Sequence, residues 1–199
     1  MAVTILLVRH AAHVHLDRRL SGRMPGVALS EAGREQAARL AQHLAIEAID
    51  RVECSPLERT RDTAAAIAAG SGLPSPAPVE ALIELDLGEW TGAAFEDLHG
   101  QPAWDRWNTE RGTARVPGGE TMAEAQARIA GHIGATAAAH DGETVLMVTH
   151  SDMIRAAVAH VLDLPLGNLH RFDIDPASIT RIVAGDWGAK LLTLNERGG

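Results

Sequence analysis

Two short apolar runs, each followed directly by a histidine, most strongly constrain the fold of this chain. Residues 3–8 precede Arg9 and His10, and residues 144–149 precede His150. Runs this short and this apolar are typical of strands in a parallel sheet that is buried on both faces. The carboxyl ends of such strands share one edge of the sheet, where open α/β folds bind their ligands. We therefore expect an α/β protein in which these two histidines and the arginine gather at that edge.

Composition narrows the class of protein further. With 199 residues, 46% of them apolar, the chain can bury a sizeable core. The formal net charge of −8 disfavours nucleic acid or an anionic membrane as a partner, so an anionic ligand would need a local cluster of Arg and His. The single cysteine, Cys54, allows no intrachain disulfide and fits a reducing compartment. The sequence has no basic leader and no apolar stretch of membrane-spanning length, so we expect a cytoplasmic protein.

Outside the two apolar runs, helix signals alternate with strand signals. Amphipathic periods and capping residues predict four helices, at residues 30–45, 56–69, 121–140 and 151–162. Short apolar runs bounded by turn residues predict further strands, at residues 51–54, 79–85, 179–184 and 190–194. This order favours a three-layer α/β/α sandwich around a mostly parallel sheet with an antiparallel edge strand.

Three segments lie between these elements. Residues 73–78 hold three prolines and are predicted to form a loop. Residues 185–188 are expected to join the last two strands as a hairpin. Residues 88–119 are irregular, with tryptophans and short helical pieces, and we interpret them as an excursion from a single domain that spans residues 1–199.

Five side chains at or just beyond predicted strand ends suit phosphate chemistry: Arg9, His10, Arg59, Glu84 and His150. Two guanidiniums can bind a tetrahedral oxyanion through paired hydrogen bonds. A neutral imidazole can attack phosphorus, and a second, protonated imidazole can stabilise the equatorial oxygens. A carboxylic acid with a raised pKa can protonate the departing alkoxide. This chemistry requires no metal and no cofactor.

Five segments carry a resemblance to a known family. They read Val-Arg-His at 8–10, Ser-Pro-Leu-Glu-Arg-Thr at 55–60, Glu-Leu-Asp-Leu-Gly-Glu-Trp at 84–90, Pro-Gly-Gly-Glu-Thr at 117–121 and Val-Thr-His-Ser-Asp-Met-Ile-Arg at 148–155. In this order, and nearly from end to end, the chain resembles the histidine phosphatase superfamily, also called the phosphoglycerate mutase-like family.

The resemblance implies a phosphoglycerate mutase-like fold and a metal-independent phosphomonoester hydrolase that acts on a small phosphorylated metabolite. It implies that His10 is phosphorylated during turnover and that Glu84 is the proton donor. The phosphate pocket would be formed by Arg9, Arg59 and His150. In such proteins the excursion covers the active site.

Three weaker candidates for substrate binding come from the same resemblance. Ser21 and Gly22 fall where family members contact substrate after the first strand. Ser151 follows the second histidine, where glycine is common in the family.

The chain departs from the family pattern just after the first histidine. Ala11 replaces the usual glycine, His13 stands at a position that is often threonine, and Leu16 at one that is often asparagine. The pocket should therefore lack one polar phosphate contact, which either His13 or His15 could replace.

Other interpretations of the same residues stay open to test. The set His10, His13 and His15 invites a metal site, although its spacing fits no standard zinc pattern. The letters His-Ser-Asp at residues 150–152 spell a hydrolase triad, but adjacency is not triad geometry and no nucleophile-elbow motif is present.

Two alternative functions also remain. One is a phosphoglycerate mutase dependent on 2,3-bisphosphoglycerate, which the shortness of residues 85–117 disfavours. The other is a phosphate-binding regulatory module with little turnover, supported only by the altered loop after His10. The sequence does not define the substrate or the oligomeric state, with a homodimer among the possibilities.

Overall fold

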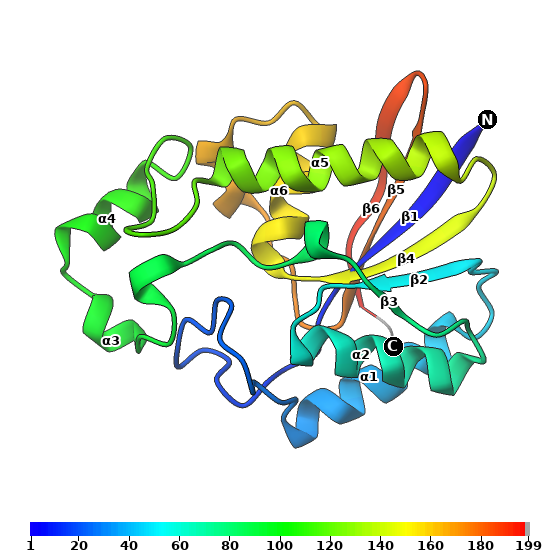
Figure 1. Cartoon of the computed structure of the whole chain (residues 1–199), viewed down its shortest axis with the longest axis horizontal. Helices are drawn as coiled ribbons and strands as arrows, with labels where there is room; N and C mark the ends of the chain where they lie inside the picture. The colour runs from blue at the N-terminus through cyan, green and yellow to red at the C-terminus, as the bar shows by residue number, and fades with distance from the viewer. Residues whose placement is uncertain (198–199) are drawn as a thin grey trace.

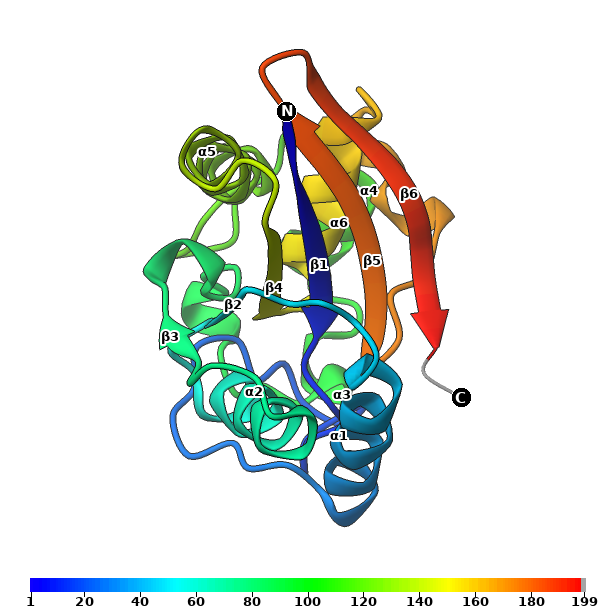
Figure 2. The same ribbon diagram turned by 90° about the vertical axis from the view of Figure 1, so that its right-hand side faces the viewer.

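A six-stranded sheet with helices on both faces makes up the structure, a computed structural model that describes residues 1–197 (Figures 1 and 2). The strands are β1 (Ala2–Arg9), β2 (Arg51–Cys54), β3 (Ala77–Pro78), β4 (Thr144–Thr149), β5 (Ser178–Gly185) and β6 (Gly188–Arg197). Their order across the sheet is β3-β2-β4-β1-β5-β6. The first four of these pair in parallel, and the β5–β6 hairpin forms the antiparallel side. The predicted fold class is confirmed.

Burial of β1 on both faces explains its near-continuous apolar sequence. Val3, Ile5 and Leu7 belong to the core on one face of the sheet, and Leu6 and Val8 to the core on the other. All five side chains are completely buried. Burying one such side chain contributes about 1.5–3 kcal/mol, so this strand anchors both layers.

Two pairs of helices cover the sheet, as Figure 1 shows. Helices α1 (Glu31–Leu44) and α2 (Glu58–Ser71) pack together on one face, and α5 (Met122–Ala139) and α6 (Ser151–Val161) on the other. The predicted caps are present at two of them. The Ser30 hydroxyl accepts a hydrogen bond from the backbone N–H of Gly33 at 3.1 Å, and Thr121 forms a reciprocal capping box with Glu124.

Two local predictions are wrong. Residues 79–85 do not form a strand: Glu80–Leu82 is a short 3₁₀ helix (η1), and pairing is limited to β3, inside the segment expected as a loop. The N–H of Val79 donates to the carbonyl of Cys54, after which the chain turns away from the sheet. Because Pro78 has no N–H, it adds no ladder hydrogen bond of its own. Helix α2 also starts later than predicted, with Leu57 as its N-cap.

The excursion folds beyond the carboxyl ends of the parallel strands (Figure 1). It holds a 3₁₀ turn, η2 (Gly88–Trp90), and two helices, α3 (Phe95–Leu98) and α4 (Pro102–Thr109). Trp90 packs edge-on against Trp104 and Trp107, and these aromatics join the core on the face of the sheet that α5 and α6 cover. After α6, a third 3₁₀ segment, η3 (Leu166–Arg171), leads to β5.

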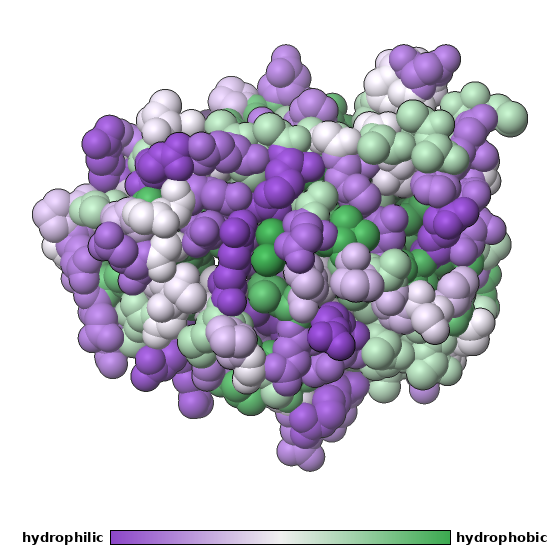
Figure 3. Space-filling model, in the orientation of Figure 1, coloured by the Kyte–Doolittle hydropathy of each residue, from purple (hydrophilic) through white to green (hydrophobic). Residues whose placement is uncertain are grey.

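The surface carries intermixed polar and apolar side chains on the face that Figure 3 shows. Within residues 1–197, no helix combines the length and the apolar character that crossing a bilayer requires.

Candidate active site

The two histidines that follow the apolar runs lie side by side. Strands β1 and β4 pair in parallel with Arg9 opposite Thr149, so the next residue on each strand leaves the sheet at the same edge. The N–H of His10 donates to the carbonyl of Thr149 at 2.9 Å. The rings of His10 and His150 meet edge to face, with centroids 5.2 Å apart. The predicted gathering of these residues at one edge is what the structure shows.

Arg59 brings a buried positive charge to these rings. It lies in the first turn of α2, and only 1% of the residue is exposed. Its Nη2 donates to Nδ1 of His150 at 3.2 Å and to the carbonyl of Gly22 at 2.8 Å. Its Nε and Nη1 are buried without a partner. A buried charge without a counter-ion costs several kcal/mol, so this guanidinium is poised to receive an anion.

Arg9 also has a guanidinium nitrogen that is buried without a hydrogen-bond partner. Its Nη1 donates to the carbonyl of Ile174 at 2.6 Å, while its Nε is buried without a partner. Burial lowers the pKa of Arg9, and burial likewise lowers the pKa of Arg59. Both arginines remain charged at neutral pH because a guanidinium loses its proton only far above that pH.

Hydrogen bonds assign the protons on both histidines. Nδ1 of His10 lies 2.9 Å from the carbonyl of Ala11, so it carries the proton and leaves a lone pair on Nε2. Nδ1 of His150 accepts from Arg59, so its Nε2 donates to the hydroxyl of Ser55 at 2.8 Å. Burial, followed by the charge of Arg59, holds the pKa of each histidine well below 6.5. Without a bound anion His150 is therefore neutral, with one ring proton. The role predicted from the sequence, a positively charged imidazole that stabilises the equatorial oxygens, requires a second ring proton during catalysis.

Glu84 completes the group with a carboxyl near Nδ1 of His150, the ring nitrogen that Arg59 also contacts. It follows η1, and its Oε2 lies 3.6 Å from Nδ1 of His150. Its Oε1 accepts from the N–H of Leu85 at 2.9 Å. Burial raises the pKa of Glu84 to about 7, the charge of Asp152 adds to the rise, and Arg59 opposes it. This carboxyl can therefore hold or release a proton near neutral pH.

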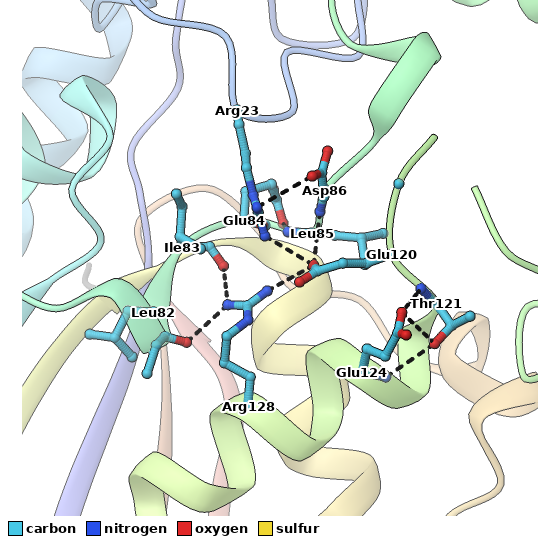
Figure 4. A network of polar contacts seen from close by, with 12 residues as sticks. Arg23, Leu82, Ile83, Glu84, Leu85, Asp86, Glu120, Thr121, Glu124 and Arg128 are labelled. Atoms are coloured by element: carbon cyan, nitrogen blue, oxygen red, sulfur yellow. Dashed lines mark hydrogen bonds and ion pairs between the residues drawn. The ribbon is translucent and has the colours of Figure 1, made fainter. Parts of the chain in front are cut away.

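A polar network fixes the backbone around Glu84 (Figure 4). Glu120 Oε2 accepts from the N–H of Asp86 at 2.9 Å and from Nη2 of Arg128 at 2.9 Å. Arg128 also donates to two backbone carbonyls just before Glu84, at 2.8 and 3.1 Å. Arg23 Nε donates to the carbonyl of Glu84 at 2.9 Å and pairs with Glu120 at 3.1 Å. The sequence analysis missed these supports, although Glu120 belongs to the Pro-Gly-Gly-Glu segment that it singled out.

The weaker candidates surround the same side chains. Gly22 contributes its carbonyl to Arg59, and Ser21 is buried with a hydroxyl that has no partner. Ser151 is the first residue of α6, directly after His150, and is half-buried. Ser55, which the sequence analysis did not assign to the site, contacts His150 directly.

The altered loop after His10 places one further histidine at the site. The ring of His13 lies 5.2 Å from that of His10, and His13 is 8% exposed. Its Nδ1 accepts from the N–H of His15 at 3.2 Å, so the neutral ring carries its proton on Nε2. Burial lowers the pKa of His13 to about 4, so its ring is neutral above that pH. Of the two candidates for the missing polar contact, the geometry favours His13, because the ring of His15 is 6.4 Å from that of His13 and farther along the chain.

The metal interpretation finds no geometric support. Among residues 1–197, no three or more His, Cys, Asp or Glu side chains converge in an arrangement that could hold a metal ion. Instead, the ring of His13 packs against those of His10 and His15, and the ring of His10 packs against that of His150.

Comparison with known proteins identifies the family. The profile of the histidine phosphatase superfamily (branch 1) matches residues 5–197. Phosphoserine phosphatase 1 of Hydrogenobacter thermophilus is 33% identical over 198 residues, covering 97% of this chain and 92% of the relative. The adenosylcobalamin/alpha-ribazole phosphatase of Salmonella typhimurium is 30% identical and covers 96% and 95%.

A solved structure shows the same fold. Bacillus stearothermophilus YhfR superposes with a TM-score of 0.91 at 26% identity, covering 98% of this chain and 97% of that one. The chain belongs to the histidine phosphatase superfamily, as its five motifs predict.

Proposed function

We propose that this chain hydrolyses phosphomonoesters through a phosphohistidine intermediate on His10. The observation that carries the proposal is that one site holds both a free lone pair, on Nε2 of His10, and a buried guanidinium without all of its partners, that of Arg59. A phosphate seated against Arg9 and Arg59 would present its phosphorus to that lone pair. The phosphatase names of the relatives support the same reaction class.

The first half of the reaction transfers the phosphoryl group to the enzyme. The Nε2 lone pair of His10 forms a bond to phosphorus while the bond from phosphorus to the ester oxygen breaks. Glu84, whose pKa burial raises to about 7, gives its proton to the leaving alkoxide. The two arginines stabilise the charge on the equatorial oxygens, and the phosphate dianion favours a proton on His150.

The second half regenerates the enzyme. Water attacks phosphorus, the bond from phosphorus to Nε2 breaks, and the Glu84 carboxylate accepts a proton from the attacking water. Phosphate then leaves, with His10 neutral and Glu84 protonated again. No step in this sequence uses a metal ion.

Release of inorganic phosphate from p-nitrophenyl phosphate and from a panel of phosphorylated metabolites, with a chelator present, tests the proposal. We expect turnover that the chelator does not change. Loss of activity on chelation, restored by added metal, would contradict the metal-independent mechanism. Phosphate binding measured by calorimetry without any hydrolysis would favour the regulatory module instead.

Mutase activity is the second candidate because one relative, 30% identical over 89% of this chain, is a probable phosphoglycerate mutase from Cronobacter sakazakii. A coupled assay that follows interconversion of 2- and 3-phosphoglycerate in the presence of 2,3-bisphosphoglycerate separates the two functions. We expect phosphate release to exceed interconversion.

Glu84→Gln should slow the hydrolysis of alkyl phosphates much more than that of p-nitrophenyl phosphate. An alkoxide needs a proton to leave, whereas p-nitrophenolate leaves without one, so kcat/KM, which reports the transfer of the phosphoryl group to the enzyme, should fall about 100-fold to 1,000-fold for the alkyl ester only. The measurement is kcat/KM for both substrates in both proteins. The exposed neighbour Glu89 provides the matched control, since Glu89→Gln should change neither value. An equal fall for both substrates would contradict the role of proton donor.

The pH dependence of alkyl phosphate hydrolysis should follow the raised pKa of Glu84. Burial raises this pKa to about 7, and the acid form donates the proton, so kcat/KM should decline as the pH rises through about 7. No acidic limb from His10 is expected near neutral pH, because burial holds the pKa of His10 well below 6.5. Initial rates from about pH 5 to about pH 9 check this shape, and the alkaline limb should disappear in Glu84→Gln.

A further inference from the structure

Besides Arg9 and Arg59, a further partly unpaired arginine lies in the excursion. Arg111 follows α4, and only 9% of its side chain is exposed. Its Nη1 lies 3.3 Å from a carboxylate oxygen of Asp152, and its guanidinium carbon is 4.9 Å from the ring centre of Trp107. Its Nε is buried without a partner. Asp152 and the Trp107 face therefore leave part of this guanidinium's hydrogen-bonding capacity unused.

The ion pair to Asp152 ties Arg111 to the active site. Asp152 lies in the first turn of α6, two residues after His150. Its negative charge adds to the rise in the pKa of Glu84 and opposes the burial that lowers the pKa of Arg9. Because Glu84 is the group placed to protonate the leaving oxygen, the alcohol part of a substrate would extend near Glu84, and the Arg111–Asp152 pair at the start of α6 borders the same site.

The backbone that carries Arg111 is held rigidly against η3. A Cβ added to Gly112 would lie 3.2 Å from the backbone nitrogen of Gly167 and 3.7 Å from Leu166. Any residue other than glycine after Arg111 would therefore require the neighbouring backbone to shift. The guanidinium is therefore positioned by the fold as well as by Asp152.

A neighbouring arginine adds to the positive charge. Arg155, one turn along α6 from Asp152, is 14% exposed and donates to the carbonyl of Leu169 at 2.9 Å. Its nearest carboxylate, Asp173 at 3.6 Å, is 86% exposed, so water screens that pair strongly. Arg111 therefore has one partly buried carboxylate partner, Asp152, and the charge of Arg155 is offset only by an exposed one. Two well-buried arginines with so little acidic compensation stand out in a chain with a net charge of −8.

We propose that Arg111, with Arg155 nearby, binds a carboxylate on the alcohol part of the substrate, so that the enzyme prefers phosphomonoesters whose alcohol carries a carboxylate. This inference rests on the proposed function and adds a substrate class to it. A planar carboxylate can accept two parallel hydrogen bonds from one guanidinium, a match that a neutral hydroxyl cannot offer. A second phosphate could supply similar charge, and the experiment below separates the two.

Two pairs of substrates that differ chiefly in the carboxylate test the inference. They are 3-phosphoglycerate against glycerol 3-phosphate, and phosphoserine against phosphoethanolamine. Within each pair the leaving group is a primary alcohol, so the ratio of kcat/KM values largely cancels the chemistry at phosphorus. We expect the carboxylated member to be favoured by about tenfold or more in both pairs, as a charge-assisted contact predicts.

Variants then assign the preference to Arg111. Arg111→Gln should bring each ratio close to one, and Asp152→Asn, which removes the competing carboxylate, should keep or increase it. Arg115→Gln is the matched control: this arginine lies in the same segment, is 55% exposed and pairs with Glu124, so the ratios should stay at the wild-type value. If Arg111→Gln does not fold, as judged by its melting curve, Arg155→Gln should reduce the ratios instead.

Several results would overturn the inference. Ratios near one in the wild type would do so, as would ratios that Arg111→Gln leaves unchanged. A preference for fructose 1,6-bisphosphate over fructose 6-phosphate, without any preference in the carboxylate pairs, would assign the arginines to a second phosphate. If no ester is hydrolysed, the proposed function fails, and calorimetric comparison of 3-phosphoglycerate with glycerol 3-phosphate still tests Arg111 independently.

Discussion

His10→Ala is expected to lower kcat by about 10⁴-fold or more, the largest effect of any single substitution in this chain. Removing Nε2 removes the atom that receives the phosphoryl group, and no other histidine occupies its place at the end of β1. His150 cannot substitute, because its Nδ1 faces Arg59 and its Nε2 faces Ser55. Steady-state kinetics with the best substrate measure the effect.

His160→Ala provides the control for this substitution. His160 is exposed near the end of α6, away from the residues that contact His10, so kcat should stay at the wild-type value. A melting curve for each variant excludes unfolding as the cause of lost activity. Retention of more than about one hundredth of wild-type kcat by His10→Ala would contradict the assignment of His10 as nucleophile.

Arg59→Met is expected to lower kcat/KM by about 10³-fold or more. Methionine fills much of the same volume but offers no donor, so the phosphate loses a charged partner whose Nε and Nη1 have no other one. Inorganic phosphate should also bind more weakly, which calorimetry can measure. Both kcat and KM should change, because the Arg59 guanidinium binds the phosphate both in the bound substrate and in the transition state.

The stability of Arg59→Met should change in two opposing ways. The substitution removes a buried charge without a counter-ion, which stabilises the fold, but it leaves the carbonyl of Gly22 without its donor, which costs about 1–3 kcal/mol. Arg61→Met, on the exposed side of α2, is the matched control and should preserve kcat/KM. Near-normal activity of Arg59→Met would contradict the claim that Arg59 binds the phosphate of the substrate.

Much of the site could be predicted because parallel pairing converts sequence position into spatial position. Once residues 3–8 and 144–149 are neighbouring strands, His10 and His150 must leave the sheet together. The five motifs in the family's order then added Arg59 and Glu84. The structure places all of these side chains around one point, with His150 in contact with three of them.

Other features depended on contacts between distant segments, which no local pattern records. The proton states of His10 and His150 follow from partners at Ala11, Arg59 and Ser55. The raised pKa of Glu84 follows from burial in the folded protein. Residues 79–85 have the composition of a strand, yet pairing stops at Pro78 because the chain turns into η1. Tertiary context decided these points.

The excursion was the least predictable part. The edge-on packing of Trp90 with Trp104 and Trp107 follows no local pattern in this irregular segment. The pairing of Arg111 with Asp152 joins residues far apart in the chain; Asp152 lies in the motif of the second histidine, but Arg111 lies in none. Such a contact became visible only when the fold brought the excursion against the start of α6.

Trapping the covalent intermediate tests the central claim most directly. The wild-type protein is mixed with a fast substrate, quenched in base within milliseconds and measured by intact mass, since phosphohistidine survives alkali better than acid. The mechanism predicts a transient added mass of one phosphoryl group, lost on acid treatment and mapped to His10 by peptide analysis. No such species should form in His10→Ala. Hydrolysis that proceeds in single turnovers without any phosphorylated protein, or with the phosphoryl group on another residue, would contradict the mechanism.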